Sequence, residues 1–313
     1  MLAYIVRRVL ATIPVMGVVA LFVFSLLYLA PGDPAAIIAG DTATVADIIR
    51  IRQKLGLDQP FLVQFGHWVW RLLHGDLGIS IFTNLPVTTL IEQRVEPTVA
   101  LTISTLIFTI PIAVPLGVLA AWKAGTWIDR SVMIFAVLGF SVPTFVLAYL
   151  LIGGFSIALD LLPVQGYSSI FNGFGPFISH LILPTITLGC FYAALVARIT
   201  RASMLDVLAQ DYVRTAQAKG LSTREVLVGH ALKNAAVPIV TIIGIGIALL
   251  ISGVVITETV YAIPGIGRLT VDAILRRDYP IIQGVILLFS AAYVLVNLAV
   301  DVSYTLLDPR VRY

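Results

Sequence analysis

Charged residues are scarce in this chain. Only 12% of its 313 residues are Asp, Glu, Lys or Arg, against roughly a quarter in soluble domains. Hydrophobic residues make up 59%, and they fall in long runs without the polar stripe of a helix that packs on a soluble core. The scarcity therefore excludes an ordinary soluble globule and indicates a lipid environment. The formal net charge of +3 is too small to indicate a nucleic-acid partner.

Residues that carry catalytic or metal chemistry are also few. The single cysteine, Cys190, cannot form an internal disulfide, and its apolar surroundings favour a small buried residue. The chain has no G-x-x-x-x-G-K-[ST] phosphate loop and no H-E-x-x-H motif. The histidines are too scattered to indicate a metal cluster: His67, His74, His180 and His230. We therefore expect no ATP hydrolysis, no metal site, no cofactor and no catalytic residue in this chain.

Six segments without charge reach the roughly 20 residues that a membrane-spanning helix needs. They are 9–30, 98–122, 131–159, 177–197, 235–257 and 281–300. Arg7 and Arg8 precede the first run as in a signal peptide, but the run exceeds a signal core, and YLAPGDP at 28–34 is a poor cleavage site. The expected fold class is therefore an all-α integral membrane protein with six transmembrane helices, the first uncleaved.

The distribution of basic residues predicts the orientation of these spans. Short cytoplasmic loops carry an excess of Lys and Arg. One side of the expected membrane carries Arg7, Arg8, Lys123, Arg130, Arg198, Arg201, Arg214, Lys219, Arg224, Lys233, Arg310 and Arg312. The short loops of the opposite side carry only Arg268, Arg276 and Arg277. Both termini are therefore expected in the cytoplasm.

No span carries a charge near its middle. A charge there costs about 2.5–3.5 kcal/mol on insertion scales, and proteins retain it mainly for proton or ion relays. An ion-coupled secondary transporter is thus disfavoured, although backbone carbonyls can also bind Na⁺. An intramembrane enzyme is disfavoured because no span presents paired carboxylates, a Ser/His set or metal ligands. Residues that bend helices or allow close approach could shape a pathway, or could simply reflect membrane-helix composition: Pro111, Pro115, Pro143, Gly244 and Gly246.

The stretch 198–234 interrupts this apolar pattern with about thirty-five residues typical of soluble helices. Apolar residues recur at helical spacing up to Gly220, which can end a helix in the left-handed conformation. Ser222 and Glu225 then form the pattern of a capping box. We expect a rigid hairpin whose second helix ends near Asn234. It could offer a shallow docking surface at Ala216 and Gly220, or pack against the chain's own span ends.

The run RASMLDVLAQDYVRTAQAKGLS at 201–222 resembles the cytoplasmic signature of permeases of binding-protein-dependent ABC importers, in the dipeptide/oligopeptide/nickel family. The general signature, E-A-A-x-x-x-G, corresponds here to Arg214, Thr215, Ala216 and Gly220, so the acidic residue and the first alanine are absent. Val237-Pro238 also lies farther downstream than the general motif's Leu-Pro, and both departures resemble the peptide-family variant. Further likeness lies at 55–80, 86–94, 115–122 and 258–269 and in the terminal LLDPRVRY.

The resemblance implies a cytoplasmic coupling helix between the fourth and fifth spans. It implies that two permease chains form a translocation pathway, that two cytoplasmic ATPases hold ATP and magnesium, and that a periplasmic or extracellular substrate-binding protein delivers the cargo. The membrane would be the bacterial inner membrane, and di- or oligopeptides the leading cargo, with nickel chelates, glutathione, haem, sugars or opines as alternatives. The implied docking surface contains Arg214, Ala216, Lys219, Gly220, Leu221 and Ser222. Arg198 and Arg201 could brace the base of the hairpin or anchor the fourth span.

The long loop after the first span adds a second expected surface. Segments 44–56 and 61–75 predict two short helices, and Trp68 and Trp70 favour a helix at the membrane interface. This loop could contact the binding protein or cap the outer mouth of the pathway. The last outer loop supplies further candidate contacts: Glu258, Arg268, Asp272, Arg276, Arg277 and Asp278. The expected organisation is thus 1–97 with the first span and this loop, 98–306 as a five-helix core, and 307–313 as a cytoplasmic tail.

Overall fold

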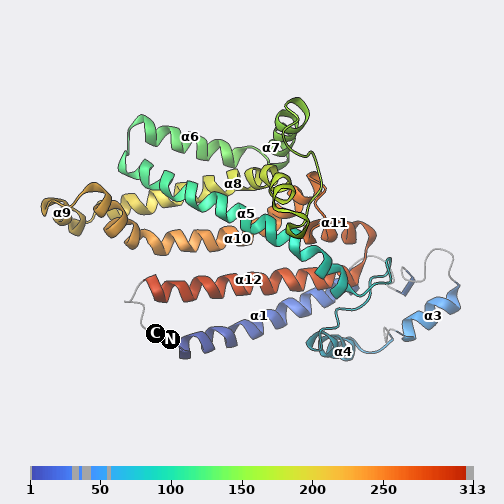
Figure 1. Cartoon of the computed structure of the whole chain (residues 1–313). Coiled ribbons are helices and arrows are strands. Elements are labelled where there is room, and N and C mark those ends of the chain that lie inside the picture. Colours follow the sequence, from blue (N-terminus) through green and yellow to red (C-terminus); the bar gives the residue numbers. More distant parts are fainter. Residues whose placement is uncertain (1, 30–34, 37–43, 55–57, 308–313) are drawn as a thin grey trace. The chain divides into compact units, whose positions relative to one another are not determined.

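The computed structural model describes residues 2–29, 35–36, 44–54 and 58–307. In these ranges the chain is helical apart from turns and one isolated bridge between Ile79 and Pro86 (Figure 1). The chain divides into two compact units. The first unit comprises Met1–Ile5, Val95–Arg268 and Leu295–Tyr313, and the second comprises Val6–Arg94 and Leu269–Val294. Residues 308–313 of the expected tail lie outside the described residues.

Five helices of the described chain are long and apolar enough to cross a membrane, and a bent pair of helices raises the number to as many as six. They are α1 (Leu2–Leu29), α5 (Val87–Trp122), α8 (Phe174–Leu208), the π-helical η3 (Glu225–Leu232) with α10 (Lys233–Val260), and α12 (Tyr279–Leu307). The bent pair is α6 (Trp127–Ser141) with α7 (Thr144–Leu151) and its π-helical continuation η1 (Ile152–Ala158). The all-helical membrane fold is therefore confirmed.

The third expected span, 131–159, is not the continuous helix that its hydropathy suggested. It bends by 100° between α6 and α7. Pro143 has no backbone N–H, and its ring pushes the preceding residue out of the helical region. Val142 is accordingly extended, with φ −81° and ψ 121°. Pro111 and Pro115, in contrast, lie inside an unbroken α5, so only Pro143 of the three marks a break.

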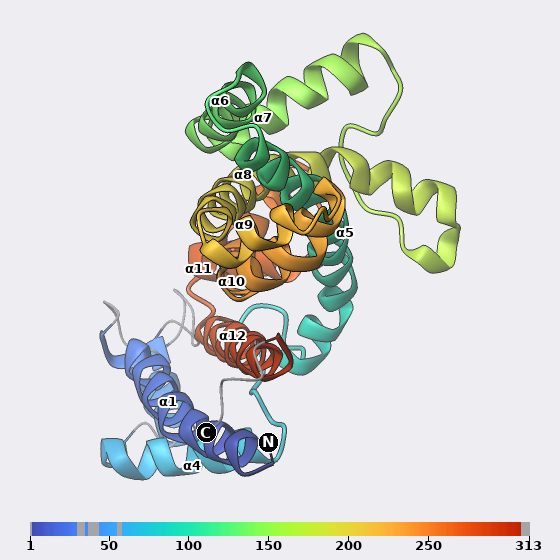
Figure 2. The ribbon, with the colours of Figure 1, turned by 90° about the vertical axis from the view of Figure 1, so that its left-hand side faces the viewer.

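The first unit is organised around α8. Its most apolar window is 67% buried, against 28% or less for the other single-helix spans. Helices α6, α7 and α10 contact it, and Figure 2 shows them gathered around it together with α5. Tyr192, at the middle of α8, is 1% exposed and donates a hydrogen bond to the carbonyl of Ile243 on α10 (2.7 Å). The core of this unit therefore lies along the fourth span.

Glycines set the closest helix contacts in this unit. A Cβ on Gly246 would lie 1.8 Å from the Tyr192 ring, and one on Gly244 would lie 2.2 Å from Val300. Gly244 and Gly246 of α10 thus face neighbouring helices of the same chain, which is the close approach that small residues permit in membranes. These two contacts explain through packing why glycine stands at both positions. A role for either glycine in shaping a pathway stays a prediction.

A buried carboxylate fixes the end of the first unit at which α10 terminates. Glu258, near the end of α10, is fully buried. It accepts hydrogen bonds from the Thr98 hydroxyl (2.6 Å) and the Arg268 amide (2.9 Å). A Cβ on Gly265 would lie 2.0–2.4 Å from this carboxyl group, so the turn 261–265 folds directly over it. The expectation that Glu258 contacts the binding protein is therefore wrong, because its side chain is enclosed by its own loop.

Replacing Glu258 by alanine is expected to destabilise the first unit by about 2–4 kcal/mol, because it leaves buried donors without an acceptor. The melting temperature of the detergent-solubilised chain should fall by several degrees. Glu92→Ala removes an exposed carboxylate of α5 and should leave the melting temperature unchanged. Equal melting temperatures for the two variants would contradict this assignment.

A second carboxylate ties the loop after η1 to α5. Glu96 Oε1 accepts hydrogen bonds from the hydroxyls of Tyr167 (3.0 Å) and Ser169 (2.6 Å) and from the Ile170 amide (3.3 Å). Burial raises the pKa of Tyr167, and the hydrogen bond to Glu96 raises this pKa further. The phenol therefore remains a donor at physiological pH. The 160–173 loop is thus held in place although it carries no basic residue.

The second unit contains α1, α3 (Val45–Lys54), α4 (Phe61–Leu73) and the first part of α12. Trp68 of α4 packs against Phe24 of α1, with ring centroids 5.5 Å apart, while Trp70 on the same helix is 64% exposed. Of the two tryptophans, only Trp70 therefore has the exposed position that is expected of an indole at the membrane interface. The two helices expected from the long outer loop are confirmed by α3 and α4.

The short connection before α12 holds one more buried carboxylate. Asp278 is 2% exposed. It accepts hydrogen bonds from the Ser80 hydroxyl (2.6 Å) and the Ile81 amide (3.3 Å). Asp278 was expected as a contact for a binding protein, but it instead joins two loops of the second unit. Arg276 and Arg277, next to it, are exposed.

Candidate coupling site

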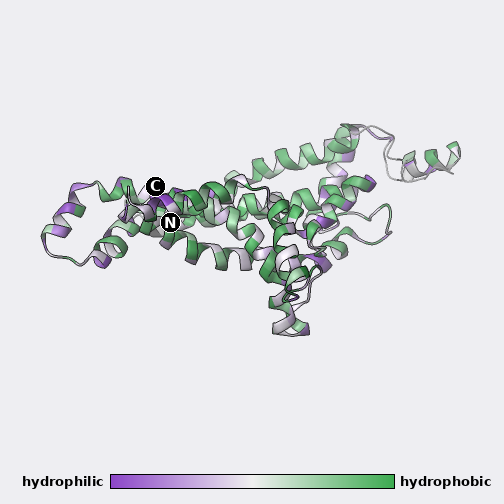
Figure 3. Cartoon of the chain, turned by 90° about the horizontal axis from the view of Figure 1, so that it is seen from above, coloured by the Kyte–Doolittle hydropathy of each residue, from purple (hydrophilic) through white to green (hydrophobic). Residues whose placement is uncertain are grey.

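The polar hairpin grows directly out of two spans. Helix α8 continues to Leu208, a two-residue break follows, and α9 runs from Asp211 to Ala218. After the turn, helix resumes at Thr223 and continues without interruption through η3 into α10. The hairpin therefore does not end near Asn234, because its second arm is the beginning of the fifth span. Figure 3 shows hydrophilic residues along this hairpin, at the left of the view.

Gly220 makes the turn of the hairpin. Its φ is +81°, and no heavy atom lies within 4 Å of the position that a Cβ would take. Its N–H donates to the carbonyl of Gln217 (2.9 Å), and the Leu221 N–H reaches back to Ala216 (3.4 Å). This is the left-handed helix ending that favours glycine. Steric contact within the chain does not require glycine here; the backbone conformation does.

The second arm begins with the hydrogen bonds of a capping box. The Ser222 N–H donates to Glu225 Oε2 (2.8 Å), and the Glu225 N–H donates to Ser222 Oγ (3.3 Å). Each side chain thus satisfies a backbone donor at the start of the helix. The turn is fixed on both sides, at Gly220 and at Ser222, and cannot easily deform under load.

A small apolar core joins the two arms. Val213, Ala216 and Val226 are buried, and Leu221 packs against them. Ala216 was expected on the docking surface, but it is 7% exposed and faces the other arm. Ala216 therefore supports the tip from beneath, as part of the core between the two arms.

The remaining side chains form the exposed tip of the hairpin. Arg214 and Lys219 project from α9 and its end. Arg214 is 73% exposed and lies 3.5 Å from Asp211, an ion pair too exposed to contribute much stability. Gly220 and Ser222 are exposed beside these two basic side chains. Such a surface fits a complementary groove on a partner protein better than lipid.

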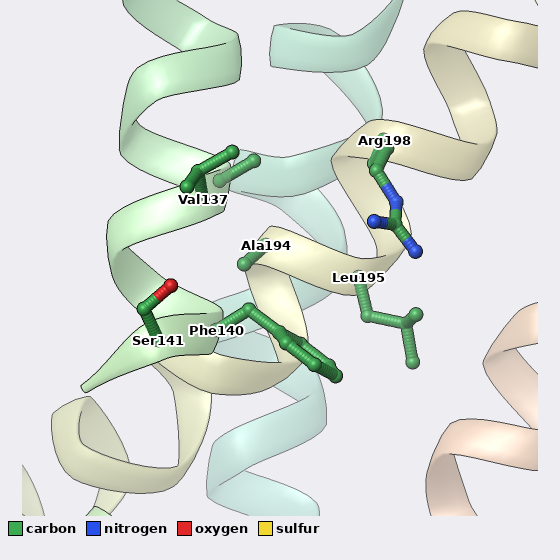
Figure 4. Close-up of a pocket in the computed structure, with 7 residues that line it drawn as sticks. Val137, Phe140, Ser141, Ala194, Leu195 and Arg198 are labelled. Carbon is green, nitrogen blue, oxygen red and sulfur yellow. The ribbon is translucent and has the colours of Figure 1, made fainter. Parts of the chain in front are cut away.

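The base of the hairpin carries the two arginines expected as braces. Arg201 binds Asp129 of α6 with two hydrogen bonds, from Nε (2.5 Å) and from a terminal nitrogen (2.7 Å). Arg198, one turn earlier, makes no ion pair with any residue in the described ranges. It borders a cavity between α6 and α8 (Figure 4). That cavity is lined by Ala136, Val137, Phe140, Ser141, Ala194, Leu195 and Arg198. Of the two arginines, Arg201 is therefore the brace.

Sequence reasoning missed Asp129, the acidic partner of this brace. One feature of the sequence could have indicated it: Asp129 is an acidic residue at the start of an apolar segment, close to the basic residues Lys123 and Arg130. Among the described residues, no group of three His, Cys, Asp or Glu side chains could hold a metal ion. The arrangement is suited to transmitting force between a bound partner and the spans.

Two family models together match most of the chain. The model described as "Binding-protein-dependent transport system inner membrane component" matches residues 113–313. A second model, for the N-terminal part of such membrane components, matches residues 1–102. The hairpin and helices α6, α7, α8 and α10 fall within the first match.

Curated relatives match over the full length. The chain is 56% identical over 310 residues to a probable peptide ABC transporter permease protein of Sinorhizobium fredii, with 99% of each chain covered. It is 44% identical over 313 residues to a glutathione transport system permease protein of Escherichia coli, with 100% of each covered. A chain in an inward-facing structure of the MetNI methionine ABC transporter shares the fold. Its TM-score is 0.59 at 18% identity, covering 71% of this chain and 97% of that one. The chain therefore belongs to the family of inner membrane components of binding-protein-dependent transport systems.

Proposed function

We propose that this chain imports peptides across the bacterial inner membrane, as one permease of an ATP-driven importer whose ATPase docks on the hairpin tip. The observation that carries the proposal is the rigid hairpin, since Gly220, the Ser222–Glu225 box and the Val213 core fix its shape. The family is one of permease subunits, in which ATP is hydrolysed by a separate subunit. ATP and its magnesium ion belong to that partner.

The partner surface would include Arg214, Lys219, Gly220, Leu221 and Ser222. Positive charge at Arg214 and Lys219 favours an acidic groove on the ATPase, and the absence of a side chain at Gly220 allows close backbone approach. A docking surface on this tip also agrees with cytoplasmic termini. Four spans precede the hairpin when the bent pair counts as one, and two follow it, so each terminus would lie on the same side as the hairpin.

The hairpin would act as a lever rather than as a passive anchor. A flexible loop would absorb the displacement of the ATPase, whereas this one continues into two spans. Only Ala209 and Gln210 interrupt the helix between α8 and α9. Movement of the docked tip would therefore reach α8, the most buried span, and α10, which packs against it. The break at Pro143 gives the third span a place where such movement can change its path.

Peptide cargo is supported by relatives along the whole chain. Their names assign peptide transport to the Sinorhizobium and Brucella proteins and glutathione transport to the Escherichia coli protein, and glutathione is itself a tripeptide. The pathway would lie between this chain and a second, homologous permease, with two ATPases below and a substrate-binding protein outside. Cargo choice would rest mainly with that binding protein. Exposed residues of the outer side, among them Trp70, Arg276 and Arg277, would be available to contact it.

Affinity purification of the chain from its native membrane in mild detergent tests this proposal. Mass spectrometry should find one or two ATPases and a second six-span permease. Vesicles containing that complex should take up labelled tripeptides only with ATP and the binding protein present. Recovery of the chain alone, or uptake that persists without ATP and collapses with the ion gradient, would instead identify a secondary transporter.

A further inference from the structure

We propose that the Asp129–Arg201 pair is a positioning clasp that makes the hairpin, α8 and the cytoplasmic half of α6 move as one body during transport. This inference rests on the proposed function, because it concerns how movement of the docked hairpin reaches the third span. Both residues act through the helices that they join.

The geometry of the pair is specific. The Arg201 guanidinium meets both carboxylate oxygens of Asp129, at 2.5 Å and 2.7 Å. Asp129 also accepts a hydrogen bond from the Gly125 amide (3.0 Å), which closes the turn before α6. Asp129 is 4% exposed, whereas 26% of the Arg201 side chain is exposed. A two-pronged contact of this kind fixes orientation as well as distance.

The clasp lies close to the hairpin. Arg201 precedes the end of α8 at Leu208 by two helical turns, or about 10 Å along the axis. At the same level, Gly117 of α5 lies against α8, where a Cβ would sit 2.6 Å from Thr200 and 2.7 Å from the Ala197 carbonyl. The ends of α5 and α6 are thus both fastened to α8 directly above the hairpin.

Apolar packing alone holds the first turns of α6 poorly. Trp127 is 75% exposed and Ile134 is 59% exposed. The buried residues of α6 are Asp129, Val132 and Ala136, and the latter two are small. Buried ion pairs generally add little stability, and their best-attested use is to fix one arrangement among several. The pair is therefore placed to select the position of α6 relative to α8 rather than to strengthen the fold.

Spin-label distances across the clasp test the proposal. The pair of labels would be at Ile134 of α6 and Tyr212 of α9, both exposed, with Cys190 replaced by serine. The complete transporter would be measured without nucleotide and after trapping with ATP and vanadate. The unmodified clasp should give one narrow distance that is the same in both states. Asp129→Asn and Arg201→Gln should broaden it and make it differ between states.

Uptake supplies the functional readout. In vesicles with the binding protein and labelled tripeptides, both variants should transport on the order of tenfold less per ATP hydrolysed, the range typical of coupled neighbouring residues. Arg201→Lys keeps the charge but loses the two-pronged contact, and should lie between. Arg130→Gln removes the adjacent exposed cation and should match the parent. Should the asparagine variant not reach the membrane, Arg201→Lys carries the same comparison.

The proposal would be contradicted if the Asp129 and Arg201 variants kept a narrow distance that is the same in both states. They would also have to transport as much peptide per ATP hydrolysed as the parent. If the proposed function itself is wrong, the experiments give a different result. In that case the parent chain would lack an ATPase altogether, and the distance distributions without nucleotide would still show whether the clasp fixes α6.

Discussion

Replacing Gly220 by asparagine is expected to weaken attachment of the ATPase on the order of tenfold, while the chain still accumulates in the membrane. Asparagine tolerates the left-handed conformation better than other side chains, so the φ of +81° is retained at small cost. The new side chain has no neighbour in the chain itself, and can collide only with a docked partner. Such a collision costs about 1–3 kcal/mol. The measurement is the amount of ATPase that co-purifies with a fixed amount of permease.

Gly75 offers the matched control for this substitution. It lies in the turn after α4 with φ +79°, and nothing lies within 4 Å of its missing Cβ. Gly75→Asn thus makes the same change in the same conformation, away from the hairpin. It should leave the recovery of ATPase unaltered. Equal recovery for the two asparagine variants and the parent would show that the partner does not approach Gly220.

Replacing Gly246 by alanine is expected to damage the fold itself. The added methyl would lie 1.8 Å from the ring of Tyr192, which is buried and hydrogen-bonded to the Ile243 carbonyl. Neither the ring nor α10 can move without disturbing the core along α8. Overpacking of this kind costs about 1–3 kcal/mol, and more where the neighbour is rigid. The melting temperature of the solubilised chain should drop clearly.

Gly153→Ala is the control for this second substitution. Gly153 also lies in a membrane helix, but nothing lies within 4 Å of its missing Cβ. This variant should melt at the parent's temperature. If both alanine variants melt like the parent but Gly246→Ala abolishes peptide uptake, Gly246 would be a pathway residue rather than a packing residue.

The membrane fold was largely predictable because its main signal is local. Runs of apolar residues locate spans by composition alone, and five helices overlap the expected spans. Their ends agree at Trp122 and differ by as much as 11 residues at Val87 and Leu208. The bend at Pro143 was accessible as well, since Val142 obeys the general restriction on residues before proline. Hydropathy obscured it, because both sides of the break are equally apolar.

Part of the shape of the hairpin could also be predicted from the sequence. The turn at Gly220 and the Ser222–Glu225 box depend on residues at most five apart. The continuity of its second arm with the fifth span was not foreseen, because polar residues such as His230 and Lys233 suggested a separate helix. Helix propensity does not stop at a change of polarity, and no glycine or proline interrupts 230–237.

Burial of single polar residues could not be predicted from the sequence. Glu258 and Asp278 are buried although they stand in a stretch of the chain rich in charged residues. Their partners, such as Thr98 and Ser80, lie far away along the chain. The same is true of Asp129, whose partner Arg201 is 72 residues away. Contacts of this range depend on how the helices pack.

Site-directed cross-linking at the hairpin tip tests the docking of the ATPase most directly. The background would be Cys190→Ser, with Lys219→Cys at the tip and Phe171→Cys, at a position 90% exposed in the loop before α8, as its counterpart. In native membranes, a short bifunctional reagent should join position 219 to the ATPase and leave position 171 unlinked to it. Cross-linking of position 171 but not 219 to the ATPase would contradict the account, as would the absence of any ATPase adduct at 219 in membranes where the ATPase co-purifies with the chain.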